Sequence, residues 1–189
     1  MKNKIAIVFT ILWMSLAFLW SCQNSKKTKC EELLRDMRST PILLPLDSMI
    51  YVGTNNNSII RNNLYRIVVY NDSRECSECS WKHMYMWNDY VKLCNEQNYD
   101  VGFIFIIRVD NYSKDNVKLR GVMKNIAFKS SYYIDTLGVF ERVNKHIPQS
   151  DIYHTFLLDN DNNVILVGNP IKYPNIDNLY LHYLSELHK

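Results

Sequence analysis

The stretch LYRIVVY at residues 64–70, followed after a short polar loop by CSEC at residues 76–79, decides the fold predicted for this chain. The first stretch is short, apolar and rich in Ile, Val and Tyr, which is typical of a buried strand. From the CSEC run to residue 96, apolar residues recur at helical spacing. A CxxC motif between a strand and a helix predicts a redox site, because the helix N-terminus stabilises a thiolate.

The chain after residue 100 continues the alternation of strands and helices. Residues 101–109 (VGFIFIIRV) are almost continuously apolar, which predicts a central strand covered on both faces. The acidic and amide-rich residues 159–163 are typical of a hairpin turn. This order predicts an α/β fold with a mixed sheet and helices on both faces. The other expected elements are strands at residues 132–134, 153–158 and 164–167 and helices at residues 115–128, 139–145 and 176–187.

The N-terminus carries an export signal. Lys2 and Lys4 precede 16 uncharged residues, and the small Ser21 stands directly before Cys22. This pattern is typical of a secretory signal, and the run is short for a membrane-spanning helix, which needs roughly 20 apolar residues. A cysteine directly after a small residue resembles the lipobox of bacterial lipoproteins, which implies cleavage before Cys22 and lipid attachment to its sulfur. The other interpretation is an uncleaved anchor, and both place the body outside the cytoplasm, tethered to a membrane.

The predicted organisation is a lipoprotein signal peptide at residues 1–21, a tether and N-terminal arm at 22–59, and one domain at 60–189. Within the arm, residues 30–37 predict a short helix and residues 41–52 an extended arm or edge strand. Gln23 is not the aspartate that keeps many such lipoproteins in the inner membrane, so we expect a lipid anchor in the outer membrane, facing the periplasm.

The charge balance excludes one class of partner. Without Lys2 and Lys4, the mature chain has 20 basic and 19 acidic side chains. It has no basic stripe with interleaved aromatic residues, so we expect no nucleic-acid partner.

Two later segments carry a family resemblance. HTFLLD at residues 154–159, with NNVILVG at 162–168, resembles the "Pro-Thr-Phe-Leu-Ile-Asp … Gly-x-Ile … Gly" segment of TlpA-like extracytoplasmic thioredoxins. Residues 133–135 (YID) are similar to the strand and aspartate that precede a short extra helix in that family. The resemblance covers roughly residues 60–188. It implies a thioredoxin-like fold and a thiol-disulfide oxidoreductase that acts on other envelope proteins without a cofactor.

Three positions depart from the family pattern. His154 stands where the family has a cis-proline, and a cis bond before another residue costs about 3 kcal/mol, which favours a trans peptide and an altered groove. Glu75 and Glu78 place negative charge beside the thiols, which opposes thiolate formation. Tyr70 replaces the buried aspartate that the family carries six residues before the first cysteine, and Asp72 is expected in the following loop.

The resemblance implies a role for each site residue. Cys76 is the expected nucleophile, and Cys79 resolves the mixed disulfide one helical turn later. His154 is expected to face the pair and to transfer a proton, or to stabilise the thiolate of Cys76 as an imidazolium.

Other interpretations stay open at the level of sequence. Cys76 and Cys79 could form a structural disulfide, although so small a loop contributes little entropy. With His154, they could bind Cu(I) or Zn(II), or the domain could be a non-catalytic binding module, but we expect no resident metal. Cys94 is expected to be a small buried residue, and a bridge from Cys94 to Cys30 is the alternative.

Overall fold

The computed structural model describes residues 27–53, 63–72, 81–110 and 112–186. The chain divides into two compact units, residues 1–39 and residues 40–189. In the first unit, residues 27–38 are helical, which confirms the helix predicted at 30–37. The predicted export signal, Cys22 and the CSEC run lie outside the described residues. In the described part of the chain, no helix is long and apolar enough to cross a membrane.

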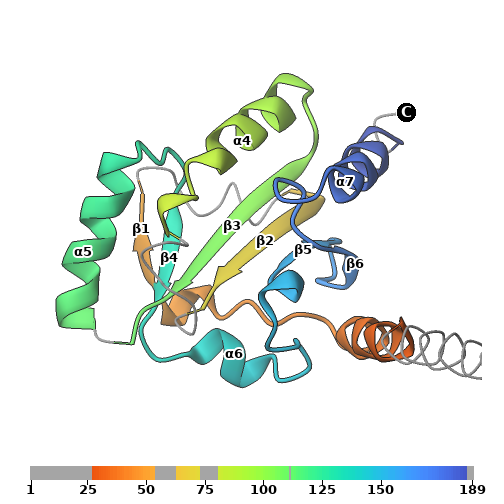
Figure 1. Ribbon diagram of the computed structural model, residues 1–189, viewed down its shortest axis with the longest axis horizontal. Coiled ribbons are helices and arrows are strands. Elements are labelled where there is room, and N and C mark those ends of the chain that lie inside the picture. The colour runs from red at the N-terminus through yellow and green to blue at the C-terminus, as the bar shows by residue number, and fades with distance from the viewer. Residues whose placement is uncertain (1–26, 54–62, 73–80, 111, 187–189) are drawn as a thin grey trace, which may run out of the picture. The chain divides into compact units, whose positions relative to one another are not determined.

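The second unit is built on one mixed sheet (Figure 1). Each strand and helix predicted between residues 101 and 187 is present, with ends shifted by a few residues. The elements are η1 (Leu46–Ser48), β1 (Ile50–Val52), β2 (Tyr65–Asn71), α4 (Met86–Glu96), β3 (Val101–Arg108), α5 (Tyr112–Asn125), β4 (Tyr132–Asp135), α6 (Val139–Val143), η2 (Asp151–Tyr153), β5 (Thr155–Leu158), β6 (Val164–Val167) and α7 (Pro174–Glu186).

The strand order of the described sheet is β1-β4-β3-β2-β5-β6. Strands β2, β3 and β4 are parallel, β5 is antiparallel to β2, and β6 is antiparallel to β5. A parallel βαβ unit followed by an antiparallel hairpin and a closing helix is the arrangement of a thioredoxin-like fold. The fold class predicted from the sequence is therefore confirmed, with β4 and the antiparallel β1 added at one edge.

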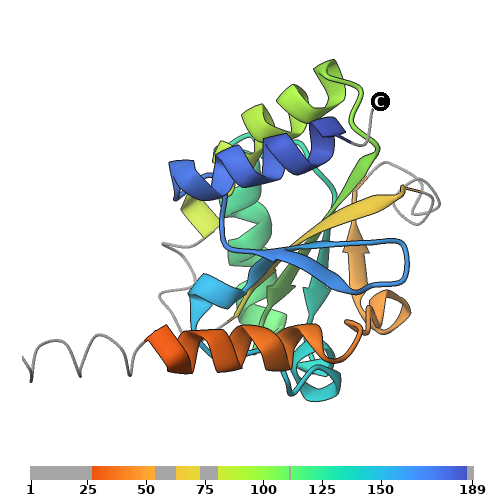
Figure 2. The ribbon, with the colours of Figure 1, turned by 90° about the vertical axis from the view of Figure 1, so that its right-hand side faces the viewer.

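The sheet is buried on both faces, as the apolar runs of β2 and β3 predict. One face, which includes Ile67, Phe105 and Ile107, packs against Trp87 of α4 and Tyr180 of α7. Figures 1 and 2 both show α4 and α7 side by side over this face. Alternate residues of the same strands are also fully buried on the other side of the sheet, among them Val68, Ile104 and Ile106. Because successive side chains point to opposite faces, a strand that is buried on both faces must be apolar throughout.

The helix predicted to run from residue 76 to residue 96 is interrupted. Residues 81–82 are helical, residues 83–85 form a turn, and α4 begins at Met86. Backbone bonds three residues apart cross this stretch, from Met84 N–H to Trp81 C=O (3.1 Å) and from Trp87 N–H to Met84 C=O (3.1 Å). These tighter turns keep Trp81, Met84 and Trp87 on one buried face, which preserves the apolar spacing that predicted the helix.

Residues 41–52 form both the arm and the edge strand that the sequence left as alternatives. The Asn144 side chain accepts from Leu43 N–H (2.8 Å) and donates to Leu43 C=O (2.9 Å). The Ile42 N–H donates to the carbonyl of Asn162 (2.9 Å), and β1 then pairs with β4. The compact unit accordingly begins at Thr40.

The connector at residues 159–163 is a turn, as predicted. The Asp159 carboxylate accepts from the backbone N–H of Asp161 (2.9 Å) and of Asn163 (2.8 Å). The buried Arg66 donates to the carbonyls of Asp159 and Asn160 from the neighbouring strand β2. The turn is therefore held both by its own aspartate and by the sheet.

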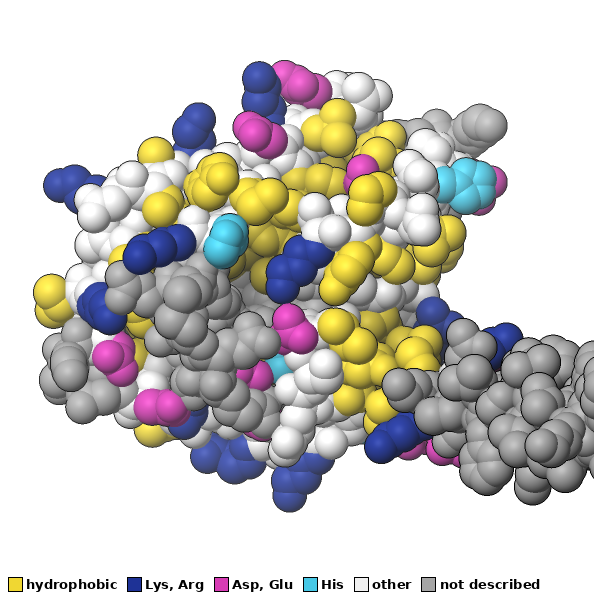
Figure 3. All heavy atoms as spheres, viewed as in Figure 1, with side chains coloured by type: hydrophobic (Ala, Val, Ile, Leu, Met, Phe, Trp, Pro, Cys, Tyr) yellow, Lys and Arg dark blue, Asp and Glu magenta, His cyan; other side chains and the backbone are white. Residues whose placement is uncertain are grey.

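Charged side chains of both signs lie together on one face of the molecule (Figure 3). On the face drawn in Figure 3, Lys and Arg side chains are interspersed with Asp and Glu side chains, and no large area of one sign stands out. This distribution agrees with the nearly balanced charge of the chain after residue 21.

Cys94 belongs to α4 and is buried in the core, with 1% of its surface exposed. It carries a free thiol, so the bridge to Cys30 that the sequence left open is not formed. Burial, followed by the charge of Asp177, raises the pKa of the Cys94 thiol to about 12.

The raised pKa of Cys94 predicts a loss of stability at alkaline pH. Between about pH 9, the ordinary value for a thiol, and pH 12, the unfolded chain loses a proton that the folded chain keeps. The free energy of unfolding should therefore fall as the pH rises, by about 1.4 kcal/mol per pH unit from this group. Urea unfolding at pH 8 to 11 should show a shallower decline in Cys94→Ala than in wild type or Cys30→Ala. Equal slopes in all three proteins would contradict this assignment.

Candidate redox site

The end of β2 and the start of β5 meet at the centre of the candidate site. The antiparallel pairing places Val69 opposite Thr155, and the Tyr70 N–H donates to the carbonyl of His154 (2.8 Å). Asp72 follows β2 directly, and His154 ends η2 just before β5 begins. The sheet register therefore brings together two residues that are 82 positions apart in the chain.

Asp72 and His154 form a buried pair. Nδ1 of His154 lies 3.4 Å from Oδ2 of Asp72, and the two side chains are only 5% and 7% exposed. A buried polar or charged group is costly to leave without a partner, and this contact pairs two such groups.

The second ring nitrogen of His154 identifies where its proton sits. Nε2 lies 3.1 Å from the carbonyl oxygen of Pro148, which can only accept, so Nε2 carries a hydrogen. Nδ1 then faces a carboxylate oxygen. A proton between these two atoms would make the contact attractive, whereas two facing lone pairs would repel each other. With that proton, the pair is an imidazolium with a carboxylate, or an imidazole with a carboxylic acid.

The pair opens onto a cavity of about 480 Å³. Asp72 and His154 line it together with Met84 and Trp87 from the α4 region and Lys172 from the segment before α7. Lys172 Nζ also lies 3.4 Å from Oδ2 of Asp151 at the exposed rim. An apolar cavity with a few convergent polar groups is the usual form of a binding or active site.

Tyr70 closes the inner side of the pair. Its ring centroid lies 5.2 Å from that of His154 and 4.8 Å from that of Phe140. Burial, more than the nearby carboxylates, raises the pKa of the Tyr70 hydroxyl, so the side chain stays neutral. Tyr70 therefore contributes low-dielectric surroundings rather than charge to the pair.

The structure places only some of the predicted site residues. His154 is buried beside the end of β2, and the peptide bond that precedes it is trans, as the sequence favours. Cys76 and Cys79 lie outside the described residues, as do Glu75 and Glu78. The described chain resumes at Trp81, which is buried in the core that supports α4.

Asp72 is a functional candidate whose burial the sequence did not predict. It lies beyond the end of β2, as expected, but it is 8% exposed rather than solvated. The site therefore does contain a buried aspartate, two positions later than the family pattern places it. The signal in the sequence was an aspartate directly after a buried strand, together with a histidine near the start of a later predicted strand.

Comparisons with known proteins give matches among solved structures alone. No family model and no curated protein matches this sequence. Among solved structures, a domain of a possible thiol-disulfide isomerase from Cytophaga hutchinsonii is 13% identical, with 79% of this chain and 99% of that chain covered and a TM-score of 0.49. The bacterioferritin comigratory protein of Xanthomonas campestris is 14% identical, with 78% of this chain and 98% of that chain covered and a TM-score of 0.49. The thioredoxin domain of a thiol-disulfide oxidoreductase from Bacteroides vulgatus is 10% identical, with 69% of this chain and 92% of that chain covered and a TM-score of 0.45. At such identities the likeness concerns the fold alone.

The buried contact between Asp72 and His154 predicts strong energetic coupling. In a double-mutant cycle of Asp72→Asn and His154→Gln, measured by urea unfolding, we expect a coupling energy of about 1 to 3 kcal/mol, because each single change removes a contact between two buried polar side chains. The matched control is the exposed pair Asp151 and Lys172, which has the same 3.4 Å separation. Its cycle should give less than about 0.5 kcal/mol. Additive effects at Asp72 and His154 would show that the two side chains do not interact.

Proposed function

We propose that this protein is a membrane-tethered thiol-disulfide oxidoreductase that acts on envelope proteins through Cys76 and Cys79. The single observation that carries the proposal is the buried Asp72–His154 pair. It lies at the end of the strand that leads, four residues after Asp72, to the first cysteine. A CxxC run after this strand of a thioredoxin-like fold and an adjacent proton-holding pair together provide the groups that disulfide exchange needs.

The proposed reaction reduces a disulfide of a substrate protein. The Cys76 thiolate attacks one substrate sulfur, a mixed disulfide forms, and the other substrate sulfur leaves as a thiolate that takes up a proton. Cys79 then loses its proton and attacks Cys76, which releases the second substrate thiol. The substrate gains two electrons and two protons, and the Cys76–Cys79 disulfide is formed. A dithiol donor must reduce this disulfide before the next cycle.

The Asp72–His154 pair would serve both steps. As an imidazolium, His154 would stabilise the Cys76 thiolate and offset the negative charges of Glu75 and Glu78. The Asp72 carboxylate would accept the Cys79 proton in the second step.

The same geometry makes metal binding by Cys76, Cys79 and His154 the weaker alternative. A metal ligand needs a ring nitrogen with an available lone pair. In the structure, Nε2 of His154 faces the carbonyl of Pro148 and Nδ1 faces the carboxylate of Asp72. Coordination would require one of these contacts to break, whereas proton transfer uses them as they stand.

The experiment is insulin reduction with dithiothreitol as the electron donor. Cys76→Ser should abolish turnover, and Cys79→Ser should accumulate the mixed disulfide, because the resolving thiol is missing. Asp72→Asn and His154→Gln should each slow the reaction at pH 7 by at least about tenfold, since a positioned proton-transfer group contributes about 10² to 10⁴. Cys94→Ala, a buried cysteine outside the proposed site, is the matched control and should keep full activity.

Two results would count against the proposal. If both cysteine variants match wild type in every thiol assay, the chain is a non-catalytic binding module. If the cysteine variants fail but Asp72→Asn and His154→Gln are fully active, the enzyme does not use the buried pair.

The tether is a separate part of the proposal. We infer that residues 1–21 are removed and that Cys22 carries the lipid, in the outer membrane and facing the periplasm. Mass spectrometry of the protein from a bacterial envelope should find an N-terminal peptide that begins at an acylated Cys22. Cys22→Ser should retain residues 1–21, because processing requires the modified cysteine, whereas Cys30→Ser should be processed normally. A wild-type chain that keeps residues 1–21 would instead indicate an uncleaved anchor.

A further inference from the structure

Strand β3 has an open edge at the end of the sheet remote from Asp72 and His154. On one side it pairs with β2 from Val101 to Ile107, which is almost its full length. On the other side it pairs with β4 only from Ile106 to Arg108. Among the described residues, no strand covers residues 101–105 on that side. A central strand of the sheet therefore becomes an edge strand over its first half.

The alternation of backbone N–H and C=O groups along β3 shows which of them face the open side. The Tyr65 N–H donates to the carbonyl of Asp100 (3.1 Å), so the backbone groups of Asp100 point toward β2. The Val109 N–H donates to the carbonyl of Asp135 (3.1 Å), so those of Val109 point toward β4. Because backbone groups alternate sides along a strand, the N–H and C=O of Phe103 point toward the open side.

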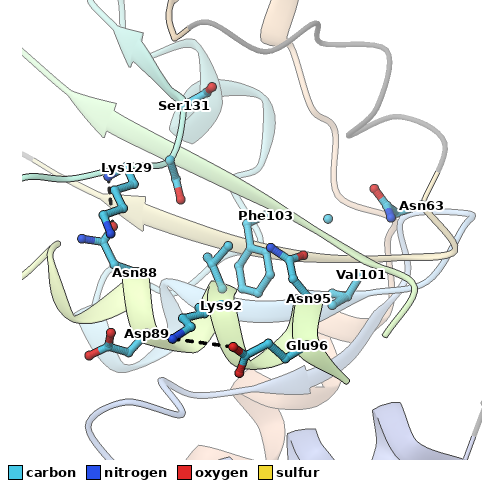
Figure 4. Close-up of a pocket in the computed structure, with 13 residues that line it drawn as sticks. Asn63, Asn88, Asp89, Lys92, Asn95, Glu96, Val101, Phe103, Lys129 and Ser131 are labelled. Atoms are coloured by element: carbon cyan, nitrogen blue, oxygen red, sulfur yellow. Dashed lines mark hydrogen bonds and ion pairs between the residues drawn. The ribbon is translucent and has the colours of Figure 1, made fainter. Parts of the chain in front are cut away.

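A hollow of about 670 Å³ lies against this edge, between β3, α4 and residues 129–131 (Figure 4). Its volume falls within the range of about 300 to 1,000 Å³ that is usual for ligand sites. The Phe103 ring points into the hollow, where Figure 4 also shows the Asn95 side chain of α4. The half-buried ring provides an apolar floor, and the strand edge provides backbone donors and acceptors.

The lining is polar and carries no net charge. Asp89 and Glu96 balance Lys92 and Lys129, and Lys92 Nζ lies 3.6 Å from Oε1 of Glu96. Hydrogen-bonding side chains without charge surround these ions, namely Asn63, Asn88, Asn95, Ser130 and Ser131. A charged ligand would gain no counter-ion here, whereas an uncharged peptide backbone would find partners on both sides.

We propose that this hollow binds an extended, uncharged segment of a partner protein, which adds as a strand beside Phe103. Strand addition to an open edge is a recurring mode of peptide recognition, in which main-chain hydrogen bonds provide affinity and side-chain pockets provide specificity. The N–H and C=O of Phe103 bond the added strand, and one side chain of that strand packs on the Phe103 ring. Because the edge and the Asp72–His154 pair lie at opposite ends of parallel strands, a partner can be held there while the candidate redox site stays accessible.

The test is amide hydrogen exchange by NMR on the full chain in detergent micelles. The probe is an acetylated and amidated heptapeptide of alternating Thr and Val. Without the peptide, the Phe103 amide should exchange at least about tenfold faster than the Ile104 amide, which points toward β2. The peptide at millimolar concentration should slow the Phe103 amide at least tenfold. The same peptide with alternate nitrogens methylated should give no protection, because it cannot complete the ladder.

A pair of variants on one helix tests the location. Asn95→Trp places a large ring in the hollow and should weaken peptide binding at least tenfold. Leu93→Trp, on the same helix but outside the hollow, should leave binding unchanged.

Four results would overturn the proposal. A slow Phe103 amide in the free protein would mean that the chain covers its own edge. Protection that rises with protein concentration alone would mean that a second copy binds there. Equal binding of the methylated peptide, or the absence of any protection, would mean that the edge is not a strand-addition site.

Discussion

The backbone hydrogen bond from Tyr70 to His154 joins the two halves of the fold at the candidate site. It belongs to the antiparallel pairing of β2 with β5, which connects the parallel βαβ unit to the C-terminal hairpin. A shift of this register by one residue would turn every side chain of β5 to the other face and separate His154 from Asp72. The close packing on both faces of the sheet opposes such a shift, because the exchanged side chains would no longer fit their buried neighbours.

The electrostatics of the site follow from this register. A buried carboxyl group and a buried imidazole are each unfavourable without a partner, and here the two side chains contact each other. Tyr70 and Phe140 keep water away from the pair on the inner side, while the cavity gives access from the other. The low dielectric of these surroundings also strengthens the electrostatic interaction between the two side chains.

Much of the architecture could be predicted from the sequence because its signals are local. The apolar runs of β2 and β3, the helical spacing of Trp87, Tyr90 and Cys94, and the turn chemistry at Asp159 each depend on residues close in the chain. The predicted ends of the helices agree less well with the structure than the predicted elements themselves. The helix predicted to reach residue 128 ends as α5 at Asn125, and Ala127 then adopts a left-handed conformation (φ 53°) that apolar spacing does not reveal.

The sequence by itself determined the order of elements, the burial of the central strands and the place of the CxxC run after the first of them. Only the tertiary structure decided that Asp72 is buried, that it contacts His154, and that no strand among the described residues covers the first half of β3 on the β4 side. These three features depend on sheet register and on where a neighbouring strand ends. Register is set by packing between residues far apart in the chain, and no local pattern of residue types encodes it.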